Sequence, residues 1–247
     1  MRRKIFVLCI LVCFAVLAYF LYQKLTFKQS STQTTNQQVQ ENNVSVPQFS
    51  LTEPNSLWII VNKQNGLPEK YVPDDLIVPD VKLRLGKTEQ QMQIRKIAHK
   101  DLKVMFAAAK KSNIDLVFGS GYRSGQLQRQ FYQQYVVQDG KKNADRYSAR
   151  PGFSEHQTGL SLDVVSPDGT CFLKQCWAET KEGKWVADHA HEYGFIVRFP
   201  KGQESITGYS YEPWHLRFVG RDLARNVFTS RQTLEEYFGL PAAPNYK

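Results

Sequence analysis

The sequence is poor in histidine and cysteine, and no internal repeat is visible in it. Five of its 247 residues are histidine and four are cysteine. Cys171 and Cys176 lie close together, but no second cysteine pair accompanies them outside the apolar N-terminal segment. This argues against a structural zinc site built from cysteine pairs.

Acidic residues are absent from the first 28 positions, which carry five positive charges on Arg2, Arg3, Lys4, Lys24 and Lys28. Taking these five from the formal net charge of +9 leaves about +4 for the rest of the chain, which is mild. We see no cluster of basic and aromatic residues of the kind that binds nucleic acid. The charge pattern therefore predicts no nucleic-acid partner.

The N-terminal segment 5–22 contains no charged residue and is long enough to approach a bilayer span as a helix. The preceding Arg2, Arg3 and Lys4 predict a cytoplasmic N-terminus. The segment ends in bulky side chains without a small-residue cleavage site, which favours an uncleaved anchor over a cleaved signal peptide. We therefore expect a single-pass protein of the cell membrane with its domain outside the cell, or a secreted protein if the segment is cleaved.

Residues 1–28 are thus the predicted membrane helix. Residues 29–50 are rich in Ser, Thr, Gln and Asn and are predicted to form a flexible linker. Residues 51–247 have the composition of a folded domain, which we expect to be monomeric. Outside the cell, Cys171 and Cys176 either form a disulfide that closes a short loop or remain as thiols, and the sequence does not decide between the two.

Hydrophobic periodicity in this domain predicts helices followed by closely spaced strands. Strands are expected at 57–61, 116–118, 160–165, 195–199 and 209–219, the last with an edge or bulge at Pro213. Helices are expected at 94–113, 125–140, 184–193 and beyond 219, with a capping box at 88–91 and a loop at 141–153. This order predicts an α+β fold with an antiparallel sheet.

Two histidines and two acids in the C-terminal half are the most informative residues. His156 precedes Asp163 by seven positions, and Glu212 precedes His215 by three. A catalytic zinc ion takes three protein ligands of this kind and leaves one position open. A nearby carboxylate can take protons from water. The set points to a hydrolase.

On a regular strand, residues seven apart face opposite sides of the sheet. A bend between His156 and Asp163 is therefore required, and Gly159 favours one. The other three histidines fall in predicted helices and are interpreted as structural: His99, His189 and His191.

Three sequence blocks extend this pattern. They are Ser120-Gly121-Tyr122-Arg123-Ser124 with Gln128, then Ser148-Ala149-Arg150-Pro151-Gly152 before Ser154-x-His156-x-x-Gly159-x-x-x-Asp163, and finally Glu212-x-Trp214-His215. In this order and spacing, over about residues 57–220, they resemble the VanY-type D-alanyl-D-alanine carboxypeptidases. These are zinc peptidases of the bacterial cell wall and include LdcB-like L,D-carboxypeptidases. The resemblance implies a hedgehog/D,D-peptidase-like α+β fold with a small antiparallel sheet and flanking helices.

The resemblance also implies roles for individual residues. His156, Asp163 and His215 would hold one Zn²⁺ ion per chain, with Glu212 as general base. Arg123 would stabilise the oxyanion or clamp the carboxylate of the peptide, unless it only braces its loop. Four further residues are implied to contact substrate, the first two by hydrogen bonds to its terminal carboxylate and the others as pocket walls: Ser154, Gln128, Tyr122 and Trp214.

The predicted function is removal of the C-terminal D-alanine from peptidoglycan stem peptides. Cleavage of D-Ala-D-Ala is favoured, with L,D-carboxypeptidase activity on tetrapeptide stems as the alternative. An endopeptidase that cuts cross-links is disfavoured by the two carboxylate-binding candidates. A non-catalytic peptidoglycan-binding module is disfavoured because a binder has no need of Glu212.

Overall fold

The computed structural model describes residues 49–247. The predicted anchor at 1–28 and nearly all of the predicted linker at 29–50 lie outside the described residues. Among the helices of the described part, none combines the length and the apolar character needed to cross a membrane.

The centre of the domain is a four-stranded antiparallel sheet with the strand order β3-β4-β6-β5. Its strands are β3 (Val117–Ser120), β4 (Ser161–Val165), β5 (Phe195–Phe199) and β6 (Glu212–Phe218). A separate two-stranded sheet pairs β1 (Leu76–Ile77) with β2 (Ile94–Arg95). Together with the helices, this confirms the predicted α+β class with a small antiparallel sheet.

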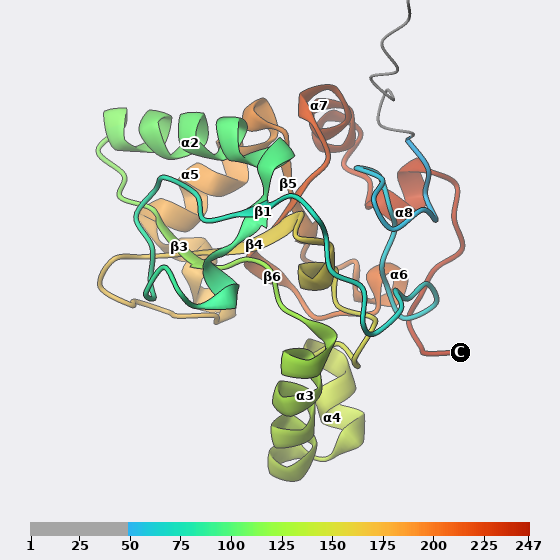
Figure 1. The fold of residues 1–247 in the computed structure, drawn as a ribbon. Coiled ribbons are helices and arrows are strands. Elements are labelled where there is room, and N and C mark those ends of the chain that lie inside the picture. Colours follow the sequence, from blue (N-terminus) through green and yellow to red (C-terminus); the bar gives the residue numbers. More distant parts are fainter. Residues whose placement is uncertain (1–48) are drawn as a thin grey trace, which may run out of the picture. The chain divides into compact units, whose positions relative to one another are not determined.

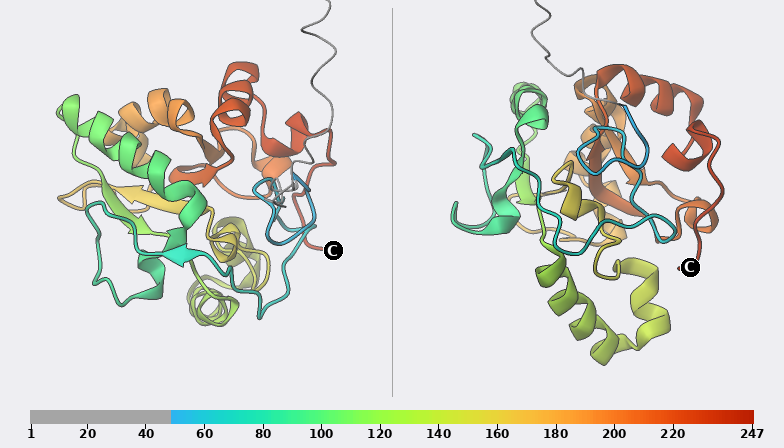
Figure 2. Two further views of the ribbon diagram at one scale, coloured as in Figure 1. Left: turned by 45° about the horizontal axis from the view of Figure 1, so that its top comes forward. Right: turned by 45° about the vertical axis from the view of Figure 1, so that its right-hand side comes forward.

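The longer helices are α2 (Lys96–Lys111), α3 (Gly125–Asp139), α5 (Lys181–His189) and α7 (Arg221–Ser230). The shorter ones are α4 (Lys141–Tyr147), α6 (Glu204–Thr207) and α8 (Leu234–Tyr237). Short 3-10 helices are η1 (Gln90–Met92), η2 (Glu155–Thr158), η3 (Gln175–Glu179) and η4 (Ala190–Tyr193). Figure 1 shows α2 and α5 above the sheet, whereas α3 and α4 project below it as a pair; the turned views in Figure 2 agree.

Alternation along β4 separates the core face of the sheet from the face that carries the site. Leu162 and Val164 are fully buried in the main apolar cluster, which also contains Leu102 of α2 and Val186 of α5. Because successive side chains of a strand point to opposite faces, Asp163 lies on the face away from these two helices. The one predicted functional residue of β4, Asp163, therefore lies on the other side of the sheet from this core.

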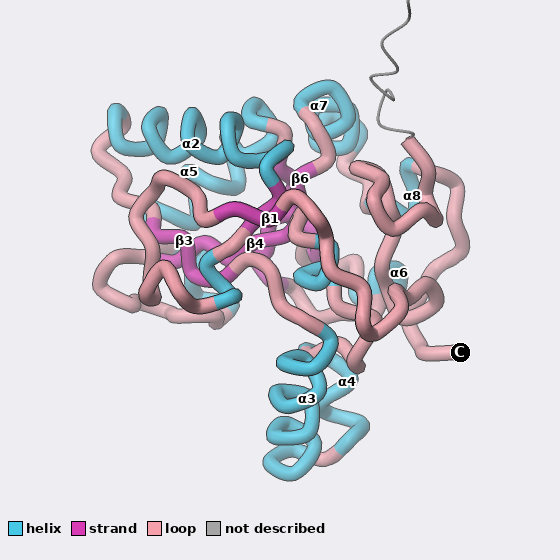
Figure 3. Tube along the Cα trace, in the orientation of Figure 1, coloured by secondary structure: helices cyan, strands magenta, loops and turns pink. Residues whose placement is uncertain are grey.

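The prediction of a strand at 57–61 is wrong. This segment has no strand partner and runs as loop (Figure 3), although Ile59, Ile60 and Val61 are buried. Its carbonyl groups are satisfied differently, because the Arg217 guanidinium donates to the carbonyl oxygens of Leu57 and Ile59 at 3.0 and 2.8 Å. A buried apolar run does not distinguish a strand from a segment that pairs with a buried cation.

Two further expectations are corrected. The predicted loop at 141–153 begins with helix α4, in which Ala144 is the one fully buried residue, so the helix leaves no apolar period in the sequence. The predicted capping box at 88–91 is absent, because Glu89 precedes η1 without a side-chain cap. A capping box does form at Thr233 and Glu236, where α8 begins.

Candidate active site

The antiparallel register of β4 and β6 brings two site residues together. Asp163 pairs directly with His215, so both side chains lie on the same face of the sheet as directly opposed neighbours. Their atoms Oδ1 and Nδ1 are 3.6 Å apart. Residues 52 positions apart in the sequence thus become neighbours through strand pairing alone.

An irregularity in β6 adds Glu212 to this face. Pairing shifts from Val197 opposite Leu216 to Phe199 opposite Glu212, so two steps along β5 match four along β6. Such an insertion changes the alternation of side chains, and the shifted stretch of this central strand contains Pro213, which cannot donate to a ladder. The irregularity confirms the predicted bulge. Glu212 Oε2 consequently lies 3.5 Å from His215 Nδ1.

The turn η2 and the following Gly159 supply the bend predicted between His156 and Asp163. Gly159 adopts a positive φ of 65°, a conformation that glycine adopts without strain. His156 Nδ1 lies 2.7 Å from the carbonyl oxygen of Gly121. Since a carbonyl oxygen only accepts, Nδ1 carries the proton and Nε2 presents its lone pair to the site. A side chain at Gly121 would clash, because its Cβ would lie 2.2 Å from the carbonyl oxygen of Gln93.

The three predicted ligands form a buried group with the geometry of a metal site. One ligand atom each from His156, Asp163 and His215 lies within 4.8 Å of the others. Asp163 Oδ1 is 3.5 Å from His156 Nε2, and two bonds of about 2.0–2.1 Å at a tetrahedral angle separate their ligand atoms by about 3.3–3.4 Å. Asp163 Oδ1 is buried without a hydrogen-bond partner among the described residues, whereas Oδ2 accepts from Ser120. The donor set and the unpaired oxygen fit Zn²⁺.

Arg123 extends from the loop after β3 into the same cavity. Its guanidinium donates to Gln128 Oε1 at 3.0 Å, and its Nε is buried with no partner in the described structure. The Gln128 amide nitrogen donates to the Ala149 carbonyl oxygen at 2.6 Å. Both ends of the Gln128 amide therefore have protein partners, and one of these contacts fixes the position of Arg123.

The cavity has a volume of about 430 Å³. Ser154 and Trp214 line it together with Gln128, and their contact with substrate stays a prediction. Tyr122 is not among the residues that line it and is buried elsewhere in the domain. The prediction that Tyr122 forms a pocket wall therefore has no support in the geometry.

Burial and neighbouring charges set the protonation of the site. Burial raises the pKa of Glu212 to about 7, and the Asp163 carboxylate adds to this rise. Burial alone would also raise the pKa of Asp163, but His156 and His215 hold it well below its usual range. Burial lowers the pKa of His156. Near neutral pH the site thus contains an ionised ligand carboxylate beside a Glu212 carboxyl group that can exchange a proton.

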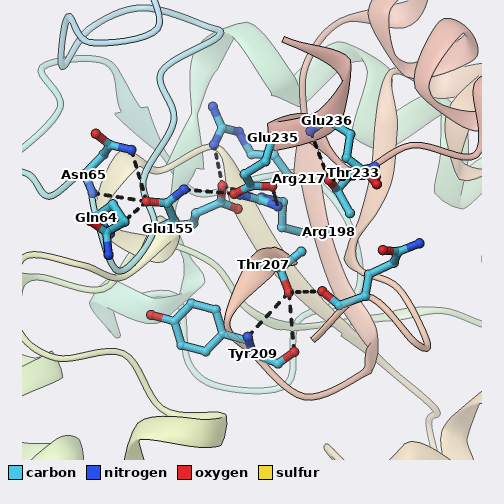
Figure 4. A network of polar contacts seen from close by, with 12 residues as sticks. Gln64, Asn65, Glu155, Arg198, Thr207, Tyr209, Arg217, Thr233, Glu235 and Glu236 are labelled. Atoms are coloured by element: carbon cyan, nitrogen blue, oxygen red, sulfur yellow. Dashed lines mark hydrogen bonds and ion pairs between the residues drawn. The ribbon is translucent and has the colours of Figure 1, made fainter. Parts of the chain in front are cut away.

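Sequence reasoning missed a polar network directly behind His215. We call Glu155, Arg198, Arg217 and Glu235 the polar network; all four side chains are at most 1% exposed. Figure 4 shows these four side chains pointing toward one another. Glu155 was overlooked because it is a polar neighbour of His156, and the two arginines because they occupy strands that otherwise read as apolar. Their charge inside such strands was the available signal.

The remaining histidines lie elsewhere. The His99 ring accepts from the backbone of Asp80 on the surface, His189 contacts Glu192, and His191 stacks on Phe228. Cys171 and Cys176 form a disulfide. Leu173 and Lys174, within the loop that it closes, line the cavity.

Comparison with known proteins agrees with this geometry. The family model VanY, D-alanyl-D-alanine carboxypeptidase, matches residues 91–221. The protein YodJ of Bacillus subtilis (strain 168) is 44% identical over 189 residues, which are 76% of this chain and 69% of YodJ.

Two solved structures extend the comparison. The LdcB LD-carboxypeptidase structure is 45% identical with a TM-score of 0.72, over 75% of this chain and 87% of that chain. The structure of a VanY D,D-pentapeptidase from a VanB-type resistance cassette, in complex with Zn(II), is 30% identical with a TM-score of 0.60. It covers 74% of this chain and 99% of that one. The family match covers more than half of the chain and includes the whole site. The chain therefore belongs to the VanY family of D-alanyl-D-alanine carboxypeptidases.

Proposed function

We propose that this protein is a zinc-dependent carboxypeptidase that removes the C-terminal D-alanine from peptidoglycan stem peptides. The observation that carries the proposal is the presence of a buried metal-type triad, a carboxyl group with a raised pKa and a partly unpaired guanidinium in one cavity. Family membership supports carboxypeptidase activity on cell-wall peptides. The zinc complex of the VanY structure supports the choice of metal.

The residues divide the work of peptide hydrolysis. A Zn²⁺ ion held by His156, Asp163 and His215 would supply a Lewis acid that polarises the scissile carbonyl and lowers the pKa of water. Glu212, beside His215, takes the proton from the attacking water and delivers it to the leaving amine. Arg123 neutralises the charge that develops on the carbonyl oxygen, or holds the peptide carboxylate.

The specificity of the cleaved bond is the finer part of the proposal. The sequence blocks favoured D-Ala-D-Ala, but the LdcB structure, an LD-carboxypeptidase, is more similar to this chain than the VanY D,D-pentapeptidase structure. We therefore propose cleavage of the L–D bond of tetrapeptide stems, with D,D cleavage of pentapeptide stems as the second candidate.

Mass spectrometry of defined substrates tests both parts. Purified full-length protein loaded with zinc is incubated with tetrapeptide stems, pentapeptide stems and a cross-linked stem dimer. Loss of one alanine from the tetrapeptide supports L,D activity, and loss from the pentapeptide alone supports D,D activity. Cleavage of the dimer at its cross-link would indicate an endopeptidase. Failure to cleave any of them, with zinc bound, would contradict the enzyme and leave the binding module. The Glu212→Gln variant controls for a contaminating peptidase.

We also propose that residues 1–28 anchor the chain in the membrane and that residues 29–50 hold the domain outside the cell near the wall. The uncharged segment 5–22 and the basic residues before it support this. Membrane fractions of producing cells should retain the protein after a high-salt wash, and protease added to spheroplasts should degrade the domain. Protein found only in the culture medium would indicate a cleaved signal instead.

A further inference from the structure

Glu155 is the residue next to His156, and its carboxylate is hydrogen-bonded to the two arginines of the polar network. Its Oε1 accepts from Arg198 Nε at 2.8 Å and from an Arg217 guanidinium nitrogen at 2.9 Å. Its Oε2 accepts from the Ser161 hydroxyl at 3.1 Å. Both oxygens of this buried carboxylate thus accept hydrogen bonds, one from two guanidinium groups and the other from a hydroxyl group.

The polar network fixes Glu155 through several segments of the chain. Arg198 donates two further hydrogen bonds, of 2.9 and 2.6 Å, to Glu235, which also accepts from Asn62 at 2.9 Å. Arg217 is fixed by backbone carbonyl groups of the segment 57–59. Two guanidinium groups and two carboxylates balance in charge, which is the condition under which such groups tolerate burial.

His215 connects this network to the site. Its Nδ1 faces Asp163 and Glu212 in the cavity. Its Nε2 faces the other way, is buried, and has no hydrogen-bond partner among the described residues. Glu155 Oε2 lies 3.6 Å from this nitrogen, a few tenths of an ångström beyond hydrogen-bond distance. A buried N–H facing a fixed carboxylate at this distance needs only a small shift to become paired.

We propose that Glu155 is a positioning residue for the metal centre: it holds His215 with Nε2–H toward the polar network and Nδ1 toward the metal. The inference rests on the proposed zinc site. A metal-binding histidine commonly donates its second ring N–H to a carboxylate, which fixes its tautomer and ring orientation. Here Arg198 and Arg217 in turn fix that carboxylate, so the chain of contacts runs from the interior of the domain to the ligand atom.

The alternative is that Glu155 serves only as a counter-ion for the two arginines. Glu235 separates the two possibilities, because it is equally buried and binds Arg198 as closely but does not contact His215. In Glu155→Gln, Arg198 and Arg217 keep the single remaining oxygen at the Oε1 position. The amide NH₂ then lies at the Oε2 position and opposes His215 Nε2–H, donor against donor. In Glu235→Gln this conflict does not arise at the metal centre.

The test compares zinc affinity in full-length wild type, Glu155→Gln and Glu235→Gln, measured by competition with a chromophoric chelator. We expect both variants to lose thermal stability, zinc affinity to fall about 10- to 100-fold in Glu155→Gln, and affinity in Glu235→Gln to stay near that of wild type. Equal affinity losses in both variants, or none in Glu155→Gln, would overturn the proposal. Absence of zinc binding by wild type would instead refute the proposed metal site.

A second measurement needs no destabilised variant. In wild type freed of zinc at about pH 8, nitrogen-15 NMR of the imidazole rings should show opposite tautomers for the two ligand histidines. His156 should carry its proton on Nδ1, where it bonds the Gly121 carbonyl, and His215 on Nε2, where it faces Glu155. A His215 ring protonated on Nδ1 would contradict a role for Glu155 in setting the tautomer.

Discussion

Two glutamates flank the two nitrogens of the His215 ring, Glu212 with a side chain 13% exposed and Glu155 fully buried, and their surroundings give them opposite properties. Glu212 in the cavity is 3.5 Å from Nδ1, and Glu155 in the polar network is 3.6 Å from Nε2. Burial raises the pKa of Glu212 to about 7. Burial alone would raise the pKa of Glu155 as well, but Arg198 and Arg217 hold it far below its usual range.

The difference lies in the hydrogen-bonded cations. Glu155 accepts from two guanidinium groups, so it stays ionised and its position is fixed. No arginine or lysine forms an ion pair with Glu212 in the described structure, so it can gain and lose a proton. Around the His215 ring, the carboxyl group that moves protons, Glu212, is therefore distinct from the one that maintains geometry, Glu155. Changes in the cavity should therefore affect rate, and changes in the polar network should affect stability and metal geometry.

The largest effect is expected from Glu212→Gln. Without a group that accepts the proton of water, kcat should fall toward the upper end of the usual loss for a general base, about 10⁴-fold. Zinc content, measured by mass spectrometry of the metal, and the melting temperature should stay near those of wild type, because the amide preserves shape. Full activity in this variant would remove Glu212 from the mechanism.

The polar network should show the reverse pattern. Arg198→Met leaves Glu155 and Glu235 without a shared cation, and breaking a buried pair typically costs about 3–5 kcal/mol of unfolding free energy. For a domain of this size we expect a fall in melting temperature of about 10 °C in calorimetry.

The matched control is Arg129→Met, whose partner Glu69 is 41% exposed. Exposed pairs contribute about 0–1 kcal/mol, so this variant should melt close to wild type. Equal losses in the two variants would show that the polar network contributes no more than a surface pair.

The same comparison explains what the sequence could predict. The cavity residues belong to ordered sequence blocks, so His156, Asp163, Glu212 and His215 were recognisable, and the structure brings all four together. Their contact depends on the register of β4 and β6 and on the irregularity at Pro213. Both features are consistent with the spacing of the site residues within the sequence blocks.

The polar network was not predictable in this way. Glu155, Arg198, Arg217 and Glu235 occupy four separate elements. Glu155 and Glu235 read as ordinary charged residues, the two arginines stand out only as charges inside apolar strands, and only the tertiary fold pairs the four. The prediction of a strand at 57–61 was wrong for the same reason. The backbone carbonyl groups of this segment pair with the Arg217 side chain, which is at least 158 positions away. Local patterns predict elements with their own periodicity, whereas buried ion pairs arise between elements.

A smaller effect in the cavity is expected from Arg123→Met. Loss of one group that stabilises transition-state charge costs about 3 kcal/mol, which corresponds to a roughly 100-fold lower kcat/KM, with zinc content unchanged. Gln128→Ala keeps the Arg123 guanidinium and removes its hydrogen-bond partner at 3.0 Å. We therefore expect kcat/KM of this variant to fall about tenfold. If Arg123 only braces its loop, Arg123→Met would lower the melting temperature and leave kcat/KM of the folded enzyme intact.

The smallest effect should come from the disulfide loop at the rim of the cavity, because this loop stabilises the fold and also lines the cavity. Replacing Cys171 and Cys176 by serine opens a loop with a sequence separation of 5, for which chain entropy predicts a loss of about 2 kcal/mol of unfolding free energy. One end of this loop stays fixed, because the buried indole of Trp177 donates to the Ser166 hydroxyl at 3.0 Å.

Leu173 and Lys174 line the cavity but lie outside the metal triad. We therefore expect KM to rise a few-fold at constant kcat in steady-state assays, and the wild-type enzyme treated with reductant should behave as the double variant does. A fall in kcat with KM unchanged would place this loop with the catalytic residues rather than at the rim.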